Sequence, residues 1–444
     1  MSLVDLECLS RALKRTEPLP LRGRVLRATG LVVEATLPRV PVGTSCEIHL
    51  GDQRRVPAEV VGFSKASALL MPFGEMQGIC EGCAVVPRES AAEVPVGPGL
   101  LGRVVDAGMR PIDGLPPPRL DHRAALNGRP PPAMRRRRIS RPLALGIKSI
   151  DALLTVGEGQ RLGVLAGPGV GKSVMLGMVA RHASADVIVV ALVGERGREV
   201  RDFVERDLGE GLARSLVVVA TADEPPLVRV RAAMAATSVA EHFRAQGLKV
   251  LLLVDSLSRV CMAQREIGLA AGEPPTSKGY PPSVFAMMPR LVERAGTDDG
   301  PGSITALYTV LAEGDDLTDP VVDAAKAILD GHVVLSRRLA SAGHFPAIDV
   351  LQSVSRVMND VASPEHLELA RATREVLATY RESADLVEVG AYVHGSNPRV
   401  DHALRCINGL NAFLRQRPDE HFTASTVLEL LTKAVGAPGE ASRA

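Results

Sequence analysis

Aromatic side chains are scarce in this sequence of 444 residues: tryptophan is absent, and aromatic residues make up only 3% of the chain. Proteins that bind single-stranded nucleic acid by stacking its bases need aromatic faces, so the composition argues against that class. An excess of charge of either sign is also missing, because 52 Lys and Arg residues stand against 51 Asp and Glu residues. This balance provides no bulk field that would attract nucleic acid or an anionic membrane. We therefore expect no nucleic-acid partner.

Long hydrophobic runs are missing as well, and no stretch is apolar over the length that a membrane span requires. The start of the chain is acidic at Asp5, where a secretory signal peptide would be basic, so we expect a cytoplasmic protein. The six cysteines are scattered. Cys80 and Cys83 are spaced as in a metal-binding knuckle, but no second pair or histidine cluster accompanies them. A turn in a reduced domain is favoured over a metal site there.

The length of the chain predicts two or three domains, because a single core rarely grows to this size. Short apolar runs separated by Gly and Pro occupy the chain to about residue 90 and predict a small β-barrel. These runs span residues 23–35 (two strands around Gly30), 45–50, 58–63 and 68–71. The leader, residues 3–15, is amphipathic. It is either a docking segment or a frayed terminus, and the second is favoured.

A connector rich in Pro and Arg follows over residues 111–142 and contains the run Arg135-Arg136-Arg137-Arg138. Pro-rich composition favours an extended path over a surface rather than a packed core. Four consecutive arginines suggest a contact with nucleic acid or anionic lipid. A solvated loop, or pairing with acidic residues of a neighbouring subunit, is favoured instead, because the charge of the whole chain is balanced.

From Gln160 onward, continuous Val, Leu and Ile runs alternate with helical patterns. Such runs are typical of strands buried on both faces, which predicts an α/β domain with a mostly parallel sheet. The runs span residues 162–166, 186–193, 216–220, 250–254, 304–310 and 332–335. Ligands of these sheets bind beyond the carboxyl ends of the strands, so the residues that follow each run are candidates for the site.

The first of these runs leads into a phosphate-binding loop. Its glycines allow backbone N–H groups to surround an anion at the start of a helix. Lys172 is expected to reach the β- and γ-phosphates, and the Ser173 hydroxyl to bind Mg²⁺. Ala166 stands where the pattern has its first glycine, a mild departure since alanine is small. The loop reads Gly167-Pro168-Gly169-Val170-Gly171-Lys172-Ser173.

Two acidic residues follow later strands of the same sheet. Asp255 directly follows the run 250–254. In P-loop NTPases, the acidic residue that supports Mg²⁺ follows an apolar strand in the same way. Glu195 follows the run 186–193 and is the candidate for orienting the attacking water. Either residue alone has a structural explanation, a helix cap for Asp255 or a surface ion pair for Glu195. Their place after a P-loop favours function.

The chain ends in helical patterns at residues 365–381, 399–416 and 424–434, followed by a tail, 436–444, that we expect to be disordered. The order of these motifs resembles the type III export ATPases of flagella and virulence injectisomes, relatives of the rotary ATP synthase catalytic subunit. The resemblance covers nearly the whole chain, and the segment Gln264–Phe285 is its most specific part. Further matches are Ala166–Ser173, Gly194–Glu199, Asp255–Arg259 and Ile328–His332.

The resemblance implies three domains: a β-barrel over residues 1–95, a RecA-like ATPase core over 96–347 and a helical domain over 348–444. It implies a homohexamer with active sites between subunits. Glu195 matches the residue that activates water, Arg196 would help to hold the phosphate end, and Arg356 matches the arginine that enters a neighbour's site. Phe345 matches the aromatic residue that stacks on adenine. The nucleotide-binding set is Gly167, Pro168, Gly169, Val170, Gly171, Lys172, Ser173, Val174 and Phe345, with Ser173 and Asp255 as metal ligands.

The function implied is Mg²⁺-dependent ATP hydrolysis that energises protein export, with release of chaperones and delivery of substrates. Implied partners are a regulator, stalk and export-gate proteins, export chaperones and cargo, at a cytoplasmic location peripheral to the inner membrane. Two alternatives stay open: another RecA-type hexameric motor (a rotary ATPase subunit or an RNA-translocating helicase), or a nucleotide-bound scaffold without turnover. The intact Lys172 and Glu195 argue against the scaffold.

Overall fold

The computed structural model describes residues 22–435 except 38, 52, 66, 89–91 and 312–318. The described residues form two compact units, one of those up to residue 93 with the short segments 225–227 and 266–274, and one of the remainder. The predicted leader (3–15) and tail (436–444) lie outside the described residues. The boundaries 1–95, 96–347 and 348–444 remain predictions.

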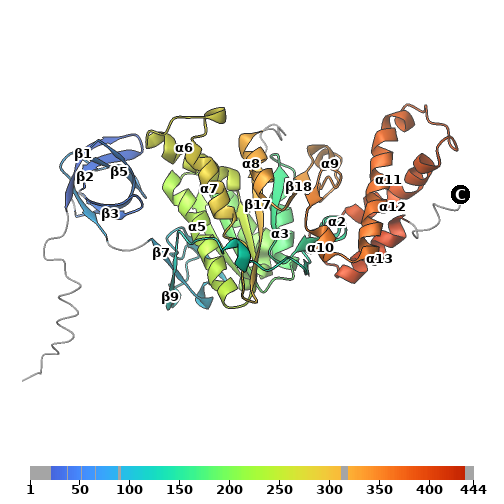
Figure 1. The fold of residues 1–444 in the computed structure, drawn as a ribbon, viewed down its shortest axis with the longest axis horizontal. Coiled ribbons are helices and arrows are strands. Elements are labelled where there is room, and N and C mark those ends of the chain that lie inside the picture. Colours follow the sequence, from blue (N-terminus) through green and yellow to red (C-terminus); the bar gives the residue numbers. More distant parts are fainter. Residues whose placement is uncertain are drawn as a thin grey trace, which may run out of the picture. The chain divides into compact units, whose positions relative to one another are not determined.

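The first unit contains the predicted β-barrel, in which six strands close in the order β1-β2-β5-β4-β3-β6 (Figure 1). Alternate side chains point inward, among them Val33, Ile48 and Leu70, which are fully buried. The sixth strand of the barrel, residues 84–87, lies outside the apolar runs and was not predicted. The strands are β1 (Gly23–Thr29), β2 (Val32–Thr36), β3 (Ser45–His49), β4 (Arg55–Ser64), β5 (Ser67–Pro72) and β6 (Ala84–Pro87).

Cys80 and Cys83 lie in a turn, where the Cys83 amide donates to the Cys80 carbonyl and the two sulfur atoms are 3.4 Å apart. Within the described ranges, no group of three His, Cys, Asp or Glu side chains is arranged to hold a metal ion. The geometry therefore agrees with the predicted turn.

The second unit is organised around a nine-stranded sheet with the order β19-β18-β12-β17-β15-β13-β14-β8 and β16 paired beside β17. All six predicted runs form strands, and neighbours from β18 to β8 are parallel, as expected from strands buried on both faces. They are β12 (Arg161–Ala166), β13 (Val187–Glu195), β14 (Ser215–Thr221), β15 (Lys249–Asp255), β17 (Ser303–Leu311) and β18 (Gly331–Leu335).

Three short strands of this sheet were not predicted. β8 (Arg103–Asp106) extends the parallel sheet beside β14, whereas β19 (Val354–Ser355) and β16 (Gly296–Thr297) are antiparallel to their neighbours. Two-stranded pairs elsewhere are β7 (Glu93–Val96) with β9 (His122–Ala125) and β10 (Pro142–Leu143) with β11 (Val156–Gly157).

Helices follow the strands in alternation, which is the pattern of a RecA-like core. They are α2 (Lys148–Leu153), α3 (Lys172–His182), α4 (Gly197–Asp202), α5 (Pro226–Ala245), α6 (Leu257–Ala270), α7 (Pro282–Val292), α8 (Pro320–Ile328), α9 (Arg337–Ser341) and α10 (Met358–Val361). No helix in the described part of the chain is long and apolar enough to span a membrane.

The arginine run of the connector is more than a solvated loop. Arg136, whose side chain is 20% exposed, pairs with Glu293 at 3.0 Å and donates to the Ala295 carbonyl. Arg137 donates to the carbonyls of Asp298 and Gly302. These bonds attach the connector to its own chain. The sequence instead favoured a solvated loop or pairing with a neighbouring subunit.

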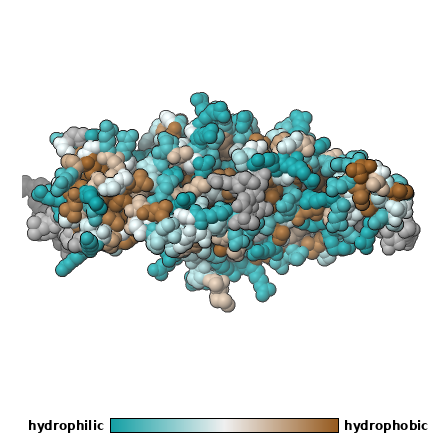
Figure 2. Space-filling view, turned by 90° about the horizontal axis from the view of Figure 1, so that it is seen from above, coloured by the Kyte–Doolittle hydropathy of each residue, from teal (hydrophilic) through white to brown (hydrophobic). Residues whose placement is uncertain are grey.

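The predicted C-terminal helices are present as α11 (Pro364–Glu388), α12 (Pro398–Leu414) and α13 (Ala424–Val435). The first two begin with an N-cap side chain followed by proline, Ser363-Pro364 and Asn397-Pro398. Buried residues such as Leu410 and Leu431 join the hydrophobic core that includes Leu153 of α2. Hydrophobic residues gather on the surface of this helical part of the chain (Figure 2). Exposed apolar side chains there are Leu386, Val389 and Val393.

Candidate active site

The P-loop connects the carboxyl end of β12 to the first turn of α3. Gly169 and Gly171 have positive φ angles of 77° and 85°, a backbone conformation that L side chains rarely adopt. Gly171 is the N-cap of α3, so the amides of the following residues have no partner within the helix. Unpaired amides at a helix N-terminus bind anions, which makes this turn suited to phosphate.

Three charged side chains meet beside the loop. The Lys172 ammonium lies 2.5 Å from Asp255 Oδ1 and 3.2 Å from Glu195 Oε1. The two carboxylates come from the carboxyl ends of β15 and β13, which are neighbours in the sheet. The side chains of Lys172, Glu195 and Asp255 are 13%, 14% and 3% exposed. The structure thus brings together three residues that are 23 and 83 positions apart in the sequence.

Burial and charge act in opposite directions on these groups. Burial disfavours the charge of Lys172, but the Asp255 and Glu195 carboxylates outweigh it, so the pKa of Lys172 lies above its ordinary value. Burial raises the pKa of Glu195, and the Asp255 charge and a hydrogen bond to Glu199 act in the same direction, against the attraction of Lys172. The Glu195 hydrogen bond also lowers the pKa of Glu199. Glu195 therefore binds a proton more readily than an ordinary glutamate, as a general base near neutral pH requires.

The donors available for a metal ion are the Asp255 carboxylate and the Ser173 hydroxyl. Asp255 Oδ1 accepts hydrogen bonds from Lys172 and, at 2.7 Å, from the Thr309 hydroxyl, while Ser173 is exposed in the first turn of α3. One carboxylate and one hydroxyl, completed by substrate phosphates and water, form the oxygen donor set that Mg²⁺ prefers. The residues present therefore fit this ion.

Phe345 lies beside the P-loop although it is 173 positions after Lys172 in the sequence. A methyl group placed on Gly171 would come within 3.3 Å of the Phe345 ring. The side chain is 45% exposed, and its backbone carbonyl accepts a hydrogen bond of 3.0 Å from the Gln416 amide. An aromatic face is thus held next to the phosphate loop.

The other predicted residues lie in different surroundings. Pro168 is exposed, whereas Gly167 and Val170 are buried and Val174 is partly buried. Arg196 directly follows Glu195 and is the N-cap of α4, with an exposed side chain. Its role in holding phosphate remains a prediction.

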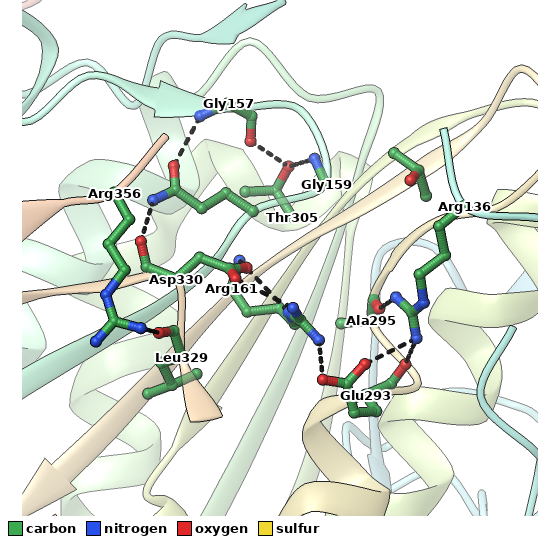
Figure 3. A network of polar contacts seen from close by, with 12 residues as sticks. Arg136, Gly157, Gly159, Arg161, Glu293, Ala295, Thr305, Leu329, Asp330 and Arg356 are labelled. Carbon is green, nitrogen blue, oxygen red and sulfur yellow. Dashed lines mark hydrogen bonds and ion pairs between the residues drawn. The ribbon is translucent and has the colours of Figure 1, made fainter. Parts of the chain in front are cut away.

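Arg356 is not part of this cluster. It follows β19, in which Ser355 pairs with Gly331 at the amino end of β18, whereas Leu335 at the carboxyl end pairs with Ala166 before the P-loop. Four residues of strand, about 13 Å, separate the two edges. The Arg356 guanidinium donates to the Leu329 carbonyl at 3.2 Å (Figure 3). It also donates to the Lys326 carbonyl at 3.3 Å. Arg356 therefore lies at the opposite edge of the sheet from its own P-loop.

Sequence reasoning missed two groups beside the cluster, the Thr309 hydroxyl and the Glu199 carboxyl. Glu199 belongs to the segment Gly194–Glu199 and lies four residues after Glu195, in the first turn of α4. Thr309 lies inside a buried strand, and only the register between β15 and β17 brings it near Asp255. No local pattern marks such a residue.

Comparisons with known proteins agree with this architecture. Residues 25–88 match the model for the ATP synthase alpha/beta family, beta-barrel domain, and residues 146–355 match the nucleotide-binding domain of the same family. Residues 362–433 match the T3SS EscN ATPase C-terminal domain. This last match is the reason that a rotary subunit and an RNA helicase are not favoured.

Individual relatives are similar over most of their length. A flagellum-specific ATP synthase of Bacillus subtilis is 47% identical, over 98% of each chain. A type 3 secretion system ATPase of Sinorhizobium fredii is 50% identical, over 92% of this chain and 90% of the relative. Among solved structures, assembled EscN from the enteropathogenic E. coli type III secretion system has a TM-score of 0.89 and 41% identity, over 93% of this chain and all of that chain.

EscN has also been solved in complex with its central stalk EscO, and this structure matches with a TM-score of 0.86 over the same share of the chain. The barrel, the parallel sheet with its P-loop and the C-terminal helices all have counterparts among these matches. The chain is therefore an ATPase and belongs to the family of flagellum-specific ATP synthases and type 3 secretion system ATPases.

Proposed function

We propose that this ATPase hydrolyses Mg-ATP to energise protein export through a type III secretion apparatus, either flagellar or injectisome. One observation carries the proposal: Lys172, Glu195 and Asp255 form a complete charged cluster at the P-loop, while Arg356 is held at the opposite edge of the sheet. A chain with both groups, placed too far apart to serve one site, is suited to a ring in which neighbours share sites.

The residues of one subunit have distinct tasks at the nucleotide. The P-loop amides and Lys172 bind the β- and γ-phosphates, and the Phe345 ring stacks on the base. Glu195 orients the attacking water and accepts its proton, for which its raised pKa is suited. Bound phosphate competes with the two carboxylates for the Lys172 ammonium, which frees Glu195 to interact with water.

Ser173 and Asp255 would hold the Mg²⁺ ion. When bound, the ion neutralises charge on the phosphate oxygens, which is its usual contribution to phosphoryl transfer. Thr309 donates to the same Asp255 oxygen as Lys172 and so keeps the carboxylate oriented when Lys172 turns toward phosphate.

The subunits would assemble as a homohexamer, in which Arg356 of one subunit enters the site of the next. An arginine supplied in this way stabilises the charge that develops on the transferred phosphoryl group and is worth about 10³–10⁵ in rate. The two carbonyl contacts of Arg356, at 3.2 and 3.3 Å, are long for hydrogen bonds, so exchanging them for a phosphate costs little.

The proposed partners are a stalk protein, for which the EscN–EscO complex is the precedent, and a regulator, export-gate proteins, chaperones and cargo. Hydrolysis would release chaperones and deliver substrates at the cytoplasmic entrance of the apparatus, peripheral to the inner membrane. The exposed Leu386 at the end of α11, with Val389 and Val393 in the connection to α12, offers an apolar surface for one such partner.

Two measurements test this proposal. ATP turnover per subunit by the purified protein should rise with protein concentration, because a site completed by a neighbour exists only in the assembly. In the native organism, replacement of the chromosomal copy by Glu195→Gln should abolish export of flagellar or effector proteins without lowering the amount of this protein. Unchanged export would contradict the function, and turnover independent of concentration would contradict the shared site.

A further inference from the structure

A buried glutamine at the amino edge of the sheet forms hydrogen bonds to three other segments of the chain. Gln160 has no exposed surface and lies immediately before β12. Its carbonyl oxygen accepts from the Gly157 amide at 2.9 Å. Its Nε2 donates to the Asp330 carbonyl at 3.0 Å and to Ser355 Oγ at 3.1 Å. Both ends of the carboxamide are therefore in use, and two of its bonds reach the chain around Arg356.

Asp330 is the second residue that holds this part of the chain, and its contacts are drawn in Figure 3. Its carbonyl accepts from the Arg356 amide at 3.0 Å, in addition to Gln160. Its carboxylate is held by Arg161, through the backbone amide at 3.0 Å, Nε at 2.9 Å and Nη2 at 3.1 Å. Arg161 also pairs with Glu293 at 2.5 Å, and Glu293 with Arg136 of the connector (Figure 3).

These bonds fix the backbone from which Arg356 projects, but not its guanidinium. The Ser355 hydroxyl, besides accepting from Gln160, donates to the Thr155 carbonyl at 2.9 Å. The Arg356 guanidinium is exposed, and among the described residues its hydrogen bonds are the two carbonyl contacts given above. A fixed backbone and a guanidinium with few contacts suit an arginine that must reach a neighbouring molecule in a defined direction.

We propose that Gln160 and the Arg161–Asp330 pair are positioning residues for Arg356, which direct its guanidinium toward the nucleotide of the next subunit. The inference rests on the proposed function, because these residues can position Arg356 for catalysis only if Arg356 acts between subunits. Gln160 lies far from the phosphates of its own subunit, since the six residues of β12 separate it from the P-loop. Misplacement of a catalytic group by about 1 Å can cost 10²-fold in rate, so loss of this support should be measurable.

The test separates the two roles of a subunit. Glu195→Ala protein can supply Arg356 but lacks a working site, and Arg356→Ala protein supplies the site but lacks the arginine. With random assembly, about one interface in four of an equimolar mixture carries both intact groups. Gln160→Met, which keeps the side-chain volume and removes all three hydrogen bonds, is then added to one partner at a time.

Gln160→Met in the partner that supplies Arg356 should lower the turnover of the mixture about tenfold. In the partner that supplies the site, the same substitution should leave turnover within about twofold. Ser355→Ala, which removes one of the three Gln160 hydrogen bonds and the bond to Thr155, should show the same asymmetry to a lesser degree. Leu162→Ala, buried on β12 but outside the network, is the control and should act equally in both partners.

Thermal unfolding of each protein shows that the variants are folded. Equal losses from Gln160→Met and Ser355→Ala in either partner, or no loss in either, would overturn the positioning role while leaving the shared site intact. A parent mixture without any turnover would instead overturn the shared site, and the positioning role with it.

Discussion

The two edges of the parallel sheet are built in opposite ways. At the carboxyl edge, the three charges of Lys172, Glu195 and Asp255 satisfy one another beside a loop of unpaired amides. At the amino edge, Gln160 and Asp330 make fixed bonds to the backbone and to Arg161. Charges that balance one another can be rearranged by an incoming phosphate, whereas a network bonded to the backbone keeps its geometry. Under the proposed function, the carboxyl edge receives the nucleotide and the amino edge holds Arg356 for the site of the next subunit.

Arg356→Ala should have the largest effect and tests the amino edge. We expect turnover to fall by about 10³–10⁵, the range for an arginine supplied in trans, with ATP affinity nearly unchanged because the P-loop is at the other edge. Single-turnover kinetics and nucleotide binding measure the two quantities. Arg371→Ala, at an exposed helical position with an ion pair to Glu368, is the matched control and should behave as wild type. Loss of ATP affinity in Arg356→Ala would remove the distinction between the edges.

Glu195→Gln tests the carboxyl edge. The substitution keeps the shape and removes the proton acceptor, so turnover should fall by about 10²–10⁴ while nucleotide still binds. Glu205→Gln, which removes an exposed carboxylate beyond α4, should have no effect. Wild-type turnover in purified Glu195→Gln protein would show that the cluster is structural rather than catalytic.

Substitutions of Phe345 separate nucleotide binding from catalysis at the carboxyl edge. Phe345→Ala should raise KM for ATP by about 5- to 100-fold, the range for loss of one stacked base, and should change kcat much less. Phe345→Tyr keeps the ring face and should stay close to wild type. A fall in kcat with unchanged KM would place the ring in catalysis instead of adenine binding.

The acid dependence of turnover gives the smallest effect and reports on Glu195 alone. Protonated Glu195 cannot accept a proton, so kcat should fall as the pH drops through its pKa, about tenfold per pH unit below it. Because burial raises that pKa, the fall should begin above the ordinary glutamate value of 4.5. The residual turnover of Glu195→Gln should lack this dependence. The same acid limb in both proteins would assign it to another group.

Much of the fold followed from the sequence, because a parallel sheet buried on both faces requires continuous apolar runs. The P-loop, Glu195 and Asp255 could be read for the same reason, since they follow such runs directly. Strands β6 and β8 are only four residues long and lie among Gly and Pro, where no periodicity develops. Thr309 and Gln160 escaped notice because their hydrogen bonds depend on register across the sheet, which a local pattern does not contain. The position of Arg356 opposite its own P-loop likewise became evident only from the pairing of β19 with β18.

The central claim, that each site is divided between subunits, is tested most directly by mixing two inactive proteins. Glu195→Ala and Arg356→Ala should each be nearly inactive alone at any concentration. An equimolar mixture under conditions of assembly should recover turnover, up to about a quarter of the wild-type rate if interfaces act independently. A mixture that is well assembled but no more active than its two components would contradict the shared site.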